Sequence, residues 1–87
     1  MERMRIHYFA AARAATGVSE EPASAFDTLG ELLEDAAARH TGRTDSGLSL
    51  ADILERCTFL VDGQRAERAT ELDGAQRVDI LPPFAGG

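Results

Sequence analysis

The sequence ends in Pro82-Pro83-Phe84-Ala85-Gly86-Gly87, a segment whose residue types and spacing suit chemistry at a carboxylate. The two prolines lack a backbone N–H and favour a stiff extended conformation, so they should lead the chain away from a folded body. The two glycines lack Cβ atoms and can enter a narrow cleft. At full extension the segment spans roughly 20 Å. We therefore predict a folded domain over residues 1–81 and a flexible tail over 82–87 that delivers its carboxylate into a partner's active site.

Activation of that carboxylate must come from outside this chain. A terminal carboxyl group has a pKa of roughly 3.5, so it is ionised at neutral pH and is a poor electrophile. A mixed anhydride with AMP would give it a good leaving group. The sequence contains neither a GxxxxGK[ST] loop nor a GxGxxG turn, so we expect ATP to be used by a partner enzyme and no cofactor to be bound here. A Gly-Gly end is often only frayed, but the preceding Pro-Pro-Phe spacer favours a functional tail.

The elements that must position this tail begin with a strand over roughly residues 3–9. There Met4, Ile6 and Tyr8 alternate with other residue types, which is the period of a strand with one buried face. A stretch of small residues, 10–16, follows. A weaker extended segment over 18–25 contains a proline, so this strand should be short or lie at a sheet edge.

A helix after residue 28 is the best-supported element. Thr28 and Glu31 have the spacing of a capping box. One apolar stripe with helical spacing then runs through Leu29, Leu32, Leu33, Ala36, Ala37 and His40. Gly42 should end the helix.

The second half of the chain reads as a loop followed by strands. We expect a polar loop over 41–49, a short helix over 49–56, strands over 57–61, 64–67 and 77–81, and turns at Asp62-Gly63 and Leu72-Asp73-Gly74. Strands, one main helix and strands again predict an α+β domain with the helix on one face of a mixed sheet.

Composition excludes several classes of function. The chain has 87 residues and a mass of 9.3 kDa, which is one small domain. A net charge of −6 with nine arginines and no lysine disfavours nucleic acid as a partner. No apolar run approaches the roughly 20 residues that span a membrane. The single cysteine rules out an internal disulfide and suits a reducing compartment, so we expect a cytoplasmic protein.

Short motifs along nearly the whole chain resemble the ubiquitin-like sulfur carriers, and within them the small subunit of molybdopterin synthase. Phe9-Ala10 with Arg13 matches F-A-x-x-R after the first strand, and the final residues match the family's ending. Weaker matches are Thr28-Leu29 with Leu32, Val61-Asp62-Gly63 and Leu72-Asp73-Gly74.

The resemblance implies the β-grasp fold and a specific chemistry. It implies that an E1-like enzyme adenylates Gly87, that a sulfurtransferase supplies sulfur to form a thiocarboxylate, and that Gly86 gives access to the cleft. It further implies that the tail enters the large subunit of molybdopterin synthase and donates sulfur for the dithiolene of the molybdenum cofactor. The chain would then be inert as an enzyme when it is alone.

Strand alternation also predicts a partner-binding surface. If Ile6 and Tyr8 face the helix, Phe9 faces the other way, and the same rule places Leu60 and Leu81 on that open face. In the β-grasp arrangement these three strands are neighbours, so we expect an apolar patch near the tail's exit. Together with Pro82, Pro83 and Phe84 it would contact the partner. Arg13 is predicted to pair with a partner carboxylate or phosphate on the strength of the motif alone.

The remaining reactive residue types are assigned no chemistry. Cys57 begins an apolar strand and is expected to be a small buried hydrophobic residue. His7 and His40 are too few and too scattered for a metal site, so we expect no metal.

Three other functions stay open. The acceptor could be the thiamine thiazole, cysteine or a specialised metabolite in place of the pterin. The chain could instead be a protein modifier that forms isopeptide bonds through Gly87, although without lysine it could not build polymers on its own side chains. It could also be a plain interaction domain.

Overall fold

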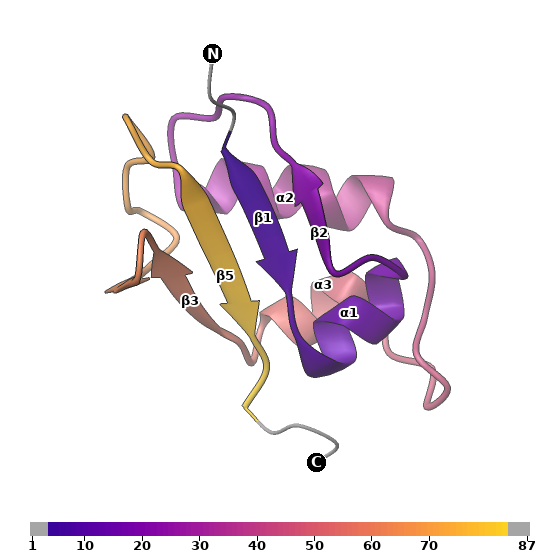
Figure 1. The fold of residues 1–87 in the computed structure, drawn as a ribbon. Coiled ribbons are helices and arrows are strands. Elements are labelled where there is room, and N and C mark those ends of the chain that lie inside the picture. Colours follow the sequence, from indigo (N-terminus) through magenta and orange to yellow (C-terminus); the bar gives the residue numbers. More distant parts are fainter. Residues whose placement is uncertain (1–3, 84–87) are drawn as a thin grey trace.

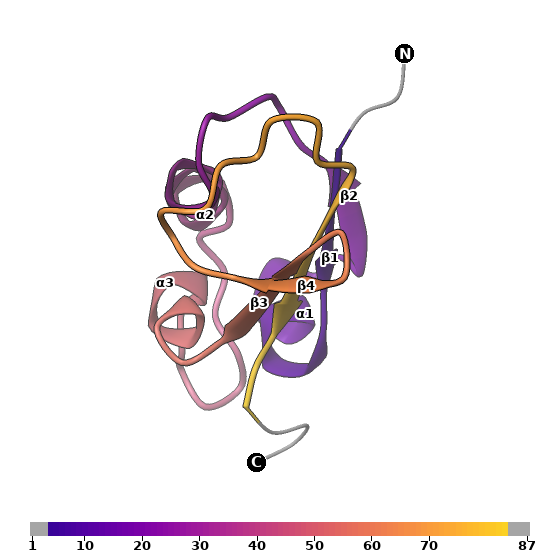
Figure 2. The ribbon, with the colours of Figure 1, turned by 90° about the vertical axis from the view of Figure 1, so that its left-hand side faces the viewer.

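The structure is a computed structural model that describes residues 4–83. Its elements are β1 (Arg5–Tyr8), α1 (Ala10–Thr16), β2 (Glu20–Pro22), α2 (Leu29–Arg39), α3 (Leu50–Leu54), β3 (Thr58–Val61), β4 (Gln64–Ala66) and β5 (Arg77–Leu81). The strands form one sheet in the order β2-β1-β5-β3-β4 (Figure 1). α2 and α3 lie on the same side of it (Figure 2).

The two central strands, β1 and β5, are parallel, and every other pair is antiparallel. Parallel neighbours need a crossover, and here the chain between β1 and β5 includes the helical layer that covers the sheet. This mixed sheet with its helical layer confirms the predicted α+β class and has the strand order of a β-grasp domain. β2 is short and lies at one edge, as its proline predicted.

Helix α1 was not predicted from the sequence. Phe9 is its N-cap residue and makes no side-chain capping hydrogen bond, so the usual starting signal is missing. The helix ends at Gly17, whose φ of 79° is left-handed and whose N–H donates to the carbonyl of Arg13. Its buried residues are Ala12 and Ala15, which are too small to stand out as an apolar stripe.

Helix α2 begins as predicted but ends earlier. The Thr28 side chain accepts from the Glu31 N–H, while the Glu31 carboxylate accepts from the N–H of Asp27 and not from that of Thr28. The last helical residue is Arg39 and His40 is the cap, so Gly42 does not end the helix. Within the described residues, a complete capping box is present in α3, between Ser49 and Asp52.

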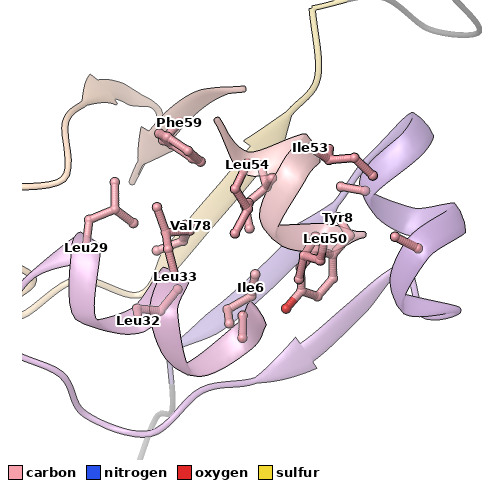
Figure 3. Packing of buried hydrophobic residues seen from close by; sticks show 14 of the residues in the cluster. Ile6, Tyr8, Leu29, Leu32, Leu33, Leu50, Ile53, Leu54, Phe59 and Val78 are labelled. Carbon is pink, nitrogen blue, oxygen red and sulfur yellow. The ribbon is translucent and has the colours of Figure 1, made fainter. Parts of the chain in front are cut away.

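The core lies between the sheet and the helices (Figure 3). Its largest fully buried side chains are Ile6, Tyr8, Leu29, Leu32, Leu33, Leu50, Val78 and Ile80. Alternate residues of β1 and β5 supply half of this set. One face of the sheet therefore packs against the helices, and no helix in the described part of the chain covers the other face, which we call the open face. Within residues 4–83, no helix is long and apolar enough to cross a membrane.

Candidate functional site

The predicted tail begins at the end of β5. β5 pairs with β1 on one side and β3 on the other, so its backbone is held along both edges. After Leu81, Pro82 is half-buried and Pro83 is exposed. The predicted partner-contacting Phe84 and the predicted reactive residues Gly86 and Gly87 lie outside the described residues. Their roles stay predictions.

The open face of the sheet has an apolar end beside this exit. The Phe9 N–H donates to the Ile80 carbonyl at 3.3 Å, which places Phe9 next to Leu81 across the β1–β5 pair. On the other side, the Tyr8 N–H donates to Ser19, so Val18 follows beside Phe9. Phe9 and Val18 are each 38% exposed, and they are among the largest exposed apolar side chains described. We call Val18, Phe9 and Leu81 the tail-end strip.

Leu60, on β3, lies near this strip but two residues farther from the tail end of the sheet. It is half-buried, and its partners across the sheet are Asp79 and Arg65. Since Thr58 is the residue opposite Leu81, Leu60 is a diagonal neighbour of the strip. The structure therefore places Phe9, Leu60 and Leu81 on one face, and it adds Val18. The sequence predicts only a weak strand over residues 18–25, and its interrupted pattern does not indicate that Val18 lies on this face.

The rest of the open face is charged. Arg5 pairs with Glu20 at 2.8 Å, and Arg77 pairs with Asp79 at 2.6 Å. The β1–β5 register places Arg5 beside Arg77, at the end of the face away from the strip. A partner that covers this face would meet an apolar strip next to the tail and arginines farther away.

A strained turn presents Phe9. Ala10 has a φ of +50°, a left-handed conformation that an alanine rarely adopts. The turn lets the chain leave β1 and enter α1 within one residue, while Phe9 keeps an extended backbone. Strain of this kind is common at functional sites. Arg13, one turn later in α1, is exposed at the same end of the molecule, and its predicted pairing with a partner stays a prediction.

Cys57 lies close to the tail exit but is a poor nucleophile. Thr58 is opposite Leu81, so Cys57 precedes β3 beside Pro82. The cysteine is half-buried against the core, and its thiol donates to the Ile53 carbonyl at 3.2 Å. Burial raises the pKa of the Cys57 thiol to about 11, so very little thiolate forms near neutral pH. This agrees with the expected role as a small hydrophobic residue.

The histidines have structural neighbours. His40 contacts the carboxylate of Glu21, and His7 lies 3.7 Å from Glu20. Over residues 4–83, the structure brings together no group of three or more side chains that suits a metal ion.

Comparisons with known proteins identify the fold and the family. The model of the ThiS family matches residues 6–87. A putative molybdopterin converting factor, subunit 1, from Pyrococcus furiosus superposes with a TM-score of 0.66 at 19% identity, covering 97% of this chain and 100% of that chain. Two crystal structures of small archaeal modifier protein 1 from Haloferax volcanii give TM-scores of 0.64 and 0.68 at 22% and 19% identity. They cover 97% of this chain and 98% and 100% of theirs. No curated protein matches. The predicted β-grasp, ubiquitin-like fold is confirmed.

Proposed function

The chain belongs to the ThiS family of ubiquitin-like sulfur carriers, and on this premise we propose that it is the small subunit of a molybdopterin synthase with Gly87 as its sulfur-carrying residue. One observation carries the proposal. The central strand β5 leads directly into Pro82 and Pro83 beside an exposed apolar strip, which suits a tail that leaves a docked domain and enters its partner. The family match includes the segment through residue 87.

The proposed chemistry takes place on the carboxyl group of Gly87. An E1-like partner joins this carboxylate to the AMP part of ATP, and pyrophosphate leaves. A sulfurtransferase persulfide then attacks the acyl carbon, AMP leaves, and reductive cleavage of the S–S bond by a thiol leaves a thiocarboxylate. ATP is bound by the partner and no cofactor by this chain. Gly86, without a Cβ, lets the reacting carbon approach the partner's active site.

The folded domain supplies the docking surface for this reaction. The tail-end strip provides apolar area next to the tail, and Leu60 extends it toward the sheet centre. Arg13 stands beside it on α1, where a guanidinium can pair with a partner carboxylate.

Intact mass spectrometry tests the carrier chemistry. The protein is incubated with ATP, an E1-like enzyme and a sulfurtransferase, and its mass should rise by the exchange of one oxygen for one sulfur. A variant lacking Gly87 should show no exchange, whereas Glu34→Gln, an exposed change on α2, should react normally. Exchange in the variant without Gly87 would overturn the proposal.

The acceptor requires a second assay. The thiocarboxylate form is offered to a molybdopterin synthase large subunit with its pterin precursor, and separately to a thiazole synthase with its precursor. The Pyrococcus furiosus neighbour, a putative molybdopterin converting factor subunit, favours the pterin. Transfer only to the thiazole precursor would retain the carrier chemistry and reject this acceptor.

A second candidate function is protein modification, which the Haloferax volcanii modifier structures favour. In that case the activated Gly87 carbonyl would form an amide with an amine of another protein. Because the chain has no lysine, its own side chains offer no amine for conjugation. Higher-mass adducts in cells, absent when Gly87 is removed, would support modification.

A further inference from the structure

A hollow of about 1040 Å³ lies at the end of the sheet opposite the tail. We call it the far-end groove. Its two sides are the segment 22–28, which links β2 to α2, and the segment 71–75, which precedes β5, and Met4 lies between them. Figure 2 shows both segments in the upper part of the view, at the end of the sheet where β1 begins. Because β1 and β5 run parallel, residues before both strands meet at this end, while the tail leaves from the other.

Hydrogen bonds hold the two sides of the far-end groove in place. The Leu72 N–H donates to the Asp27 carbonyl at 2.9 Å, and Thr28 pairs with Glu71 in an isolated bridge. The Ala23 N–H donates to the Met4 carbonyl at 2.9 Å. The groove therefore exists before any ligand arrives, which lowers the cost of ordering on binding.

The floor of the groove is apolar. Met4 and Leu72 are almost fully buried members of the core. Phe26, Ala23 and Ala75 are partly buried and pack against it. An aliphatic side chain placed here would pack against residues at the edge of the core. Its apolar surface would be removed from water, which favours binding.

The rim of the groove is acidic. Asp27, Glu71 and Asp73 are exposed, and no arginine or histidine is among the residues that line the hollow. For these three carboxylates the structure records no ion pair within residues 4–83. Three carboxylates around one hollow in a chain of net charge −6 produce a negative potential that attracts cations.

The backbone of one side is also available. Over the described part of the chain, no hydrogen bond is recorded for the N–H groups of Ser24, Ala25 and Phe26. A chain segment that lies along them in an extended conformation can accept these hydrogen bonds with its carbonyls. A small cation cannot.

From these observations we propose that the far-end groove binds a basic, extended segment of a partner protein, with arginine or lysine side chains on Asp27, Glu71 and Asp73 and aliphatic groups on the apolar floor. Long basic side chains suit this site, because their stems cover apolar surface while their charged ends stay at the rim. The hollow lies at the upper end of the volume range of small-molecule pockets and most of its lining is exposed, which favours a segment of protein.

The groove and the tail can be occupied at once. β5 separates them by roughly 13 Å or more along its length. A basic arm bound in the groove would therefore leave the tail-end strip and the tail free for an activating or accepting enzyme.

A labelled peptide tests the proposal on the full chain. The probe is the hexapeptide Arg-Leu-Arg-Leu-Arg-Leu carrying fluorescein, with spermine as a small cation for comparison. In spectra of the ¹⁵N-labelled protein, the peptide should shift amides of residues 22–28 and 71–75, and not those of Phe9 or Leu81. The triple variant Asp27→Asn/Glu71→Gln/Asp73→Asn should bind the peptide about tenfold more weakly, because it loses three exposed ion pairs with the peptide.

A matched triple variant, Glu34→Gln/Asp45→Asn/Glu55→Gln, removes the same net charge at exposed residues elsewhere and should retain most of the affinity. An equal loss in both variants, shifts confined to the sheet face, or spermine binding as tightly as the peptide would each overturn the proposal. Thermal melting checks that the groove variant is folded. If it is not, Glu71→Gln/Asp73→Asn, which leaves the start of α2 unchanged, should still weaken binding, and unchanged affinity in that variant would also overturn it.

Discussion

His40, just beyond α2, places its Nε2 atom 2.8 Å from the Oε2 atom of Glu21 on the edge strand β2. The same carboxylate accepts hydrogen bonds from the Arg39 guanidinium and the Tyr8 hydroxyl. Tyr8 belongs to β1, so this one carboxylate joins two strands to the end of the main helix. Desolvation raises the pKa of Glu21, but the hydrogen bonds from Arg39, Tyr8 and His40 outweigh it and lower the pKa to about 2.

Glu21 should therefore make folding sensitive to acid. Its pKa is lower in the folded protein than the ordinary value of 4.5, so its stabilising contribution is complete above about pH 4.5 and is lost as the pH falls toward 2. Glu21→Gln should lower the free energy of unfolding at pH 7 by about 2 kcal/mol. The variant should also lose less stability than the wild type between pH 5 and about 2. Urea titrations monitored by circular dichroism across this pH range measure both effects.

The neighbouring Glu20 provides the matched control. Its side chain points to the open face and pairs with Arg5, and both side chains are more than 40% exposed. An exposed pair of this kind contributes at most about 1 kcal/mol. Glu20→Gln should therefore change stability much less than Glu21→Gln and should keep the acid sensitivity. Equal effects of the two substitutions would contradict the role assigned to Glu21.

Cys57 should react slowly with alkylating agents despite its position beside the tail exit. Burial raises the pKa of its thiol to about 11, and the thiolate is the reactive form. At pH 7.5, iodoacetamide should modify the folded protein at least about tenfold more slowly than the unfolded protein. The rate should rise with pH until the thiol ionises. Intact mass against time gives the rate.

Sulfur transfer should not need this thiol. Cys57→Ala removes the only sulfhydryl group of the chain, yet ATP-dependent formation of a thiocarboxylate should continue at the wild-type rate because the proposed sulfur comes from a partner. If the exchange of oxygen for sulfur stops in Cys57→Ala while the melting temperature is unchanged, sulfur passes through Cys57 and the proposed route is wrong.

Elements with strong local signals could be predicted from the sequence. The apolar stripe from Leu29 onward and the Thr28 cap locate the start of α2, and Asp62-Gly63 locates the turn between β3 and β4, where both residues have positive φ. Alternation along β1, β3 and β5 distinguishes helix-facing from open-face residues, so the sequence alone is enough to place Phe9, Leu60 and Leu81 on one surface.

Features that depend on packing could not be predicted. α1 consists mainly of alanines, whose burial requires α3 to lie beside them. Glu21 is simply the second of two adjacent glutamates in the sequence, and no local pattern shows that β2 and the end of α2 meet around it. The far-end groove likewise forms between loops about 45 residues apart in the chain, which no local pattern reports.

Gly42 has a different role from the one that the sequence predicts. It was expected to end α2, but that helix ends at Arg39. A Cβ atom built at Gly42 would lie 2.9 Å from the carbonyl oxygen of Ala15, so the glycine allows the loop after α2 to approach α1. Gly42→Ala should destabilise the protein by about 1 to 3 kcal/mol, because backbone would have to move. The exposed neighbour Thr41→Ala should change stability by less than about 0.5 kcal/mol. Thermal melts of the two variants measure this difference in stability, and equal melting temperatures would contradict the role assigned to Gly42.

Phe9→Asp separates docking from folding. The substitution puts a charge into the tail-end strip and should weaken binding of the proposed activating enzyme about tenfold or more, as expected for an apolar interface residue. Stability should not fall. Phe9 is already 38% exposed, and it is the N-cap of α1 without a capping side chain, a position where aspartate can accept a hydrogen bond from the first turn. The melting temperature should therefore stay the same or rise.

Ala69→Asp, which adds the same charge at an exposed turn off the open face, should leave binding unchanged. Calorimetric titration with the enzyme measures both affinities, and wild-type binding by Phe9→Asp would remove the strip from the interface.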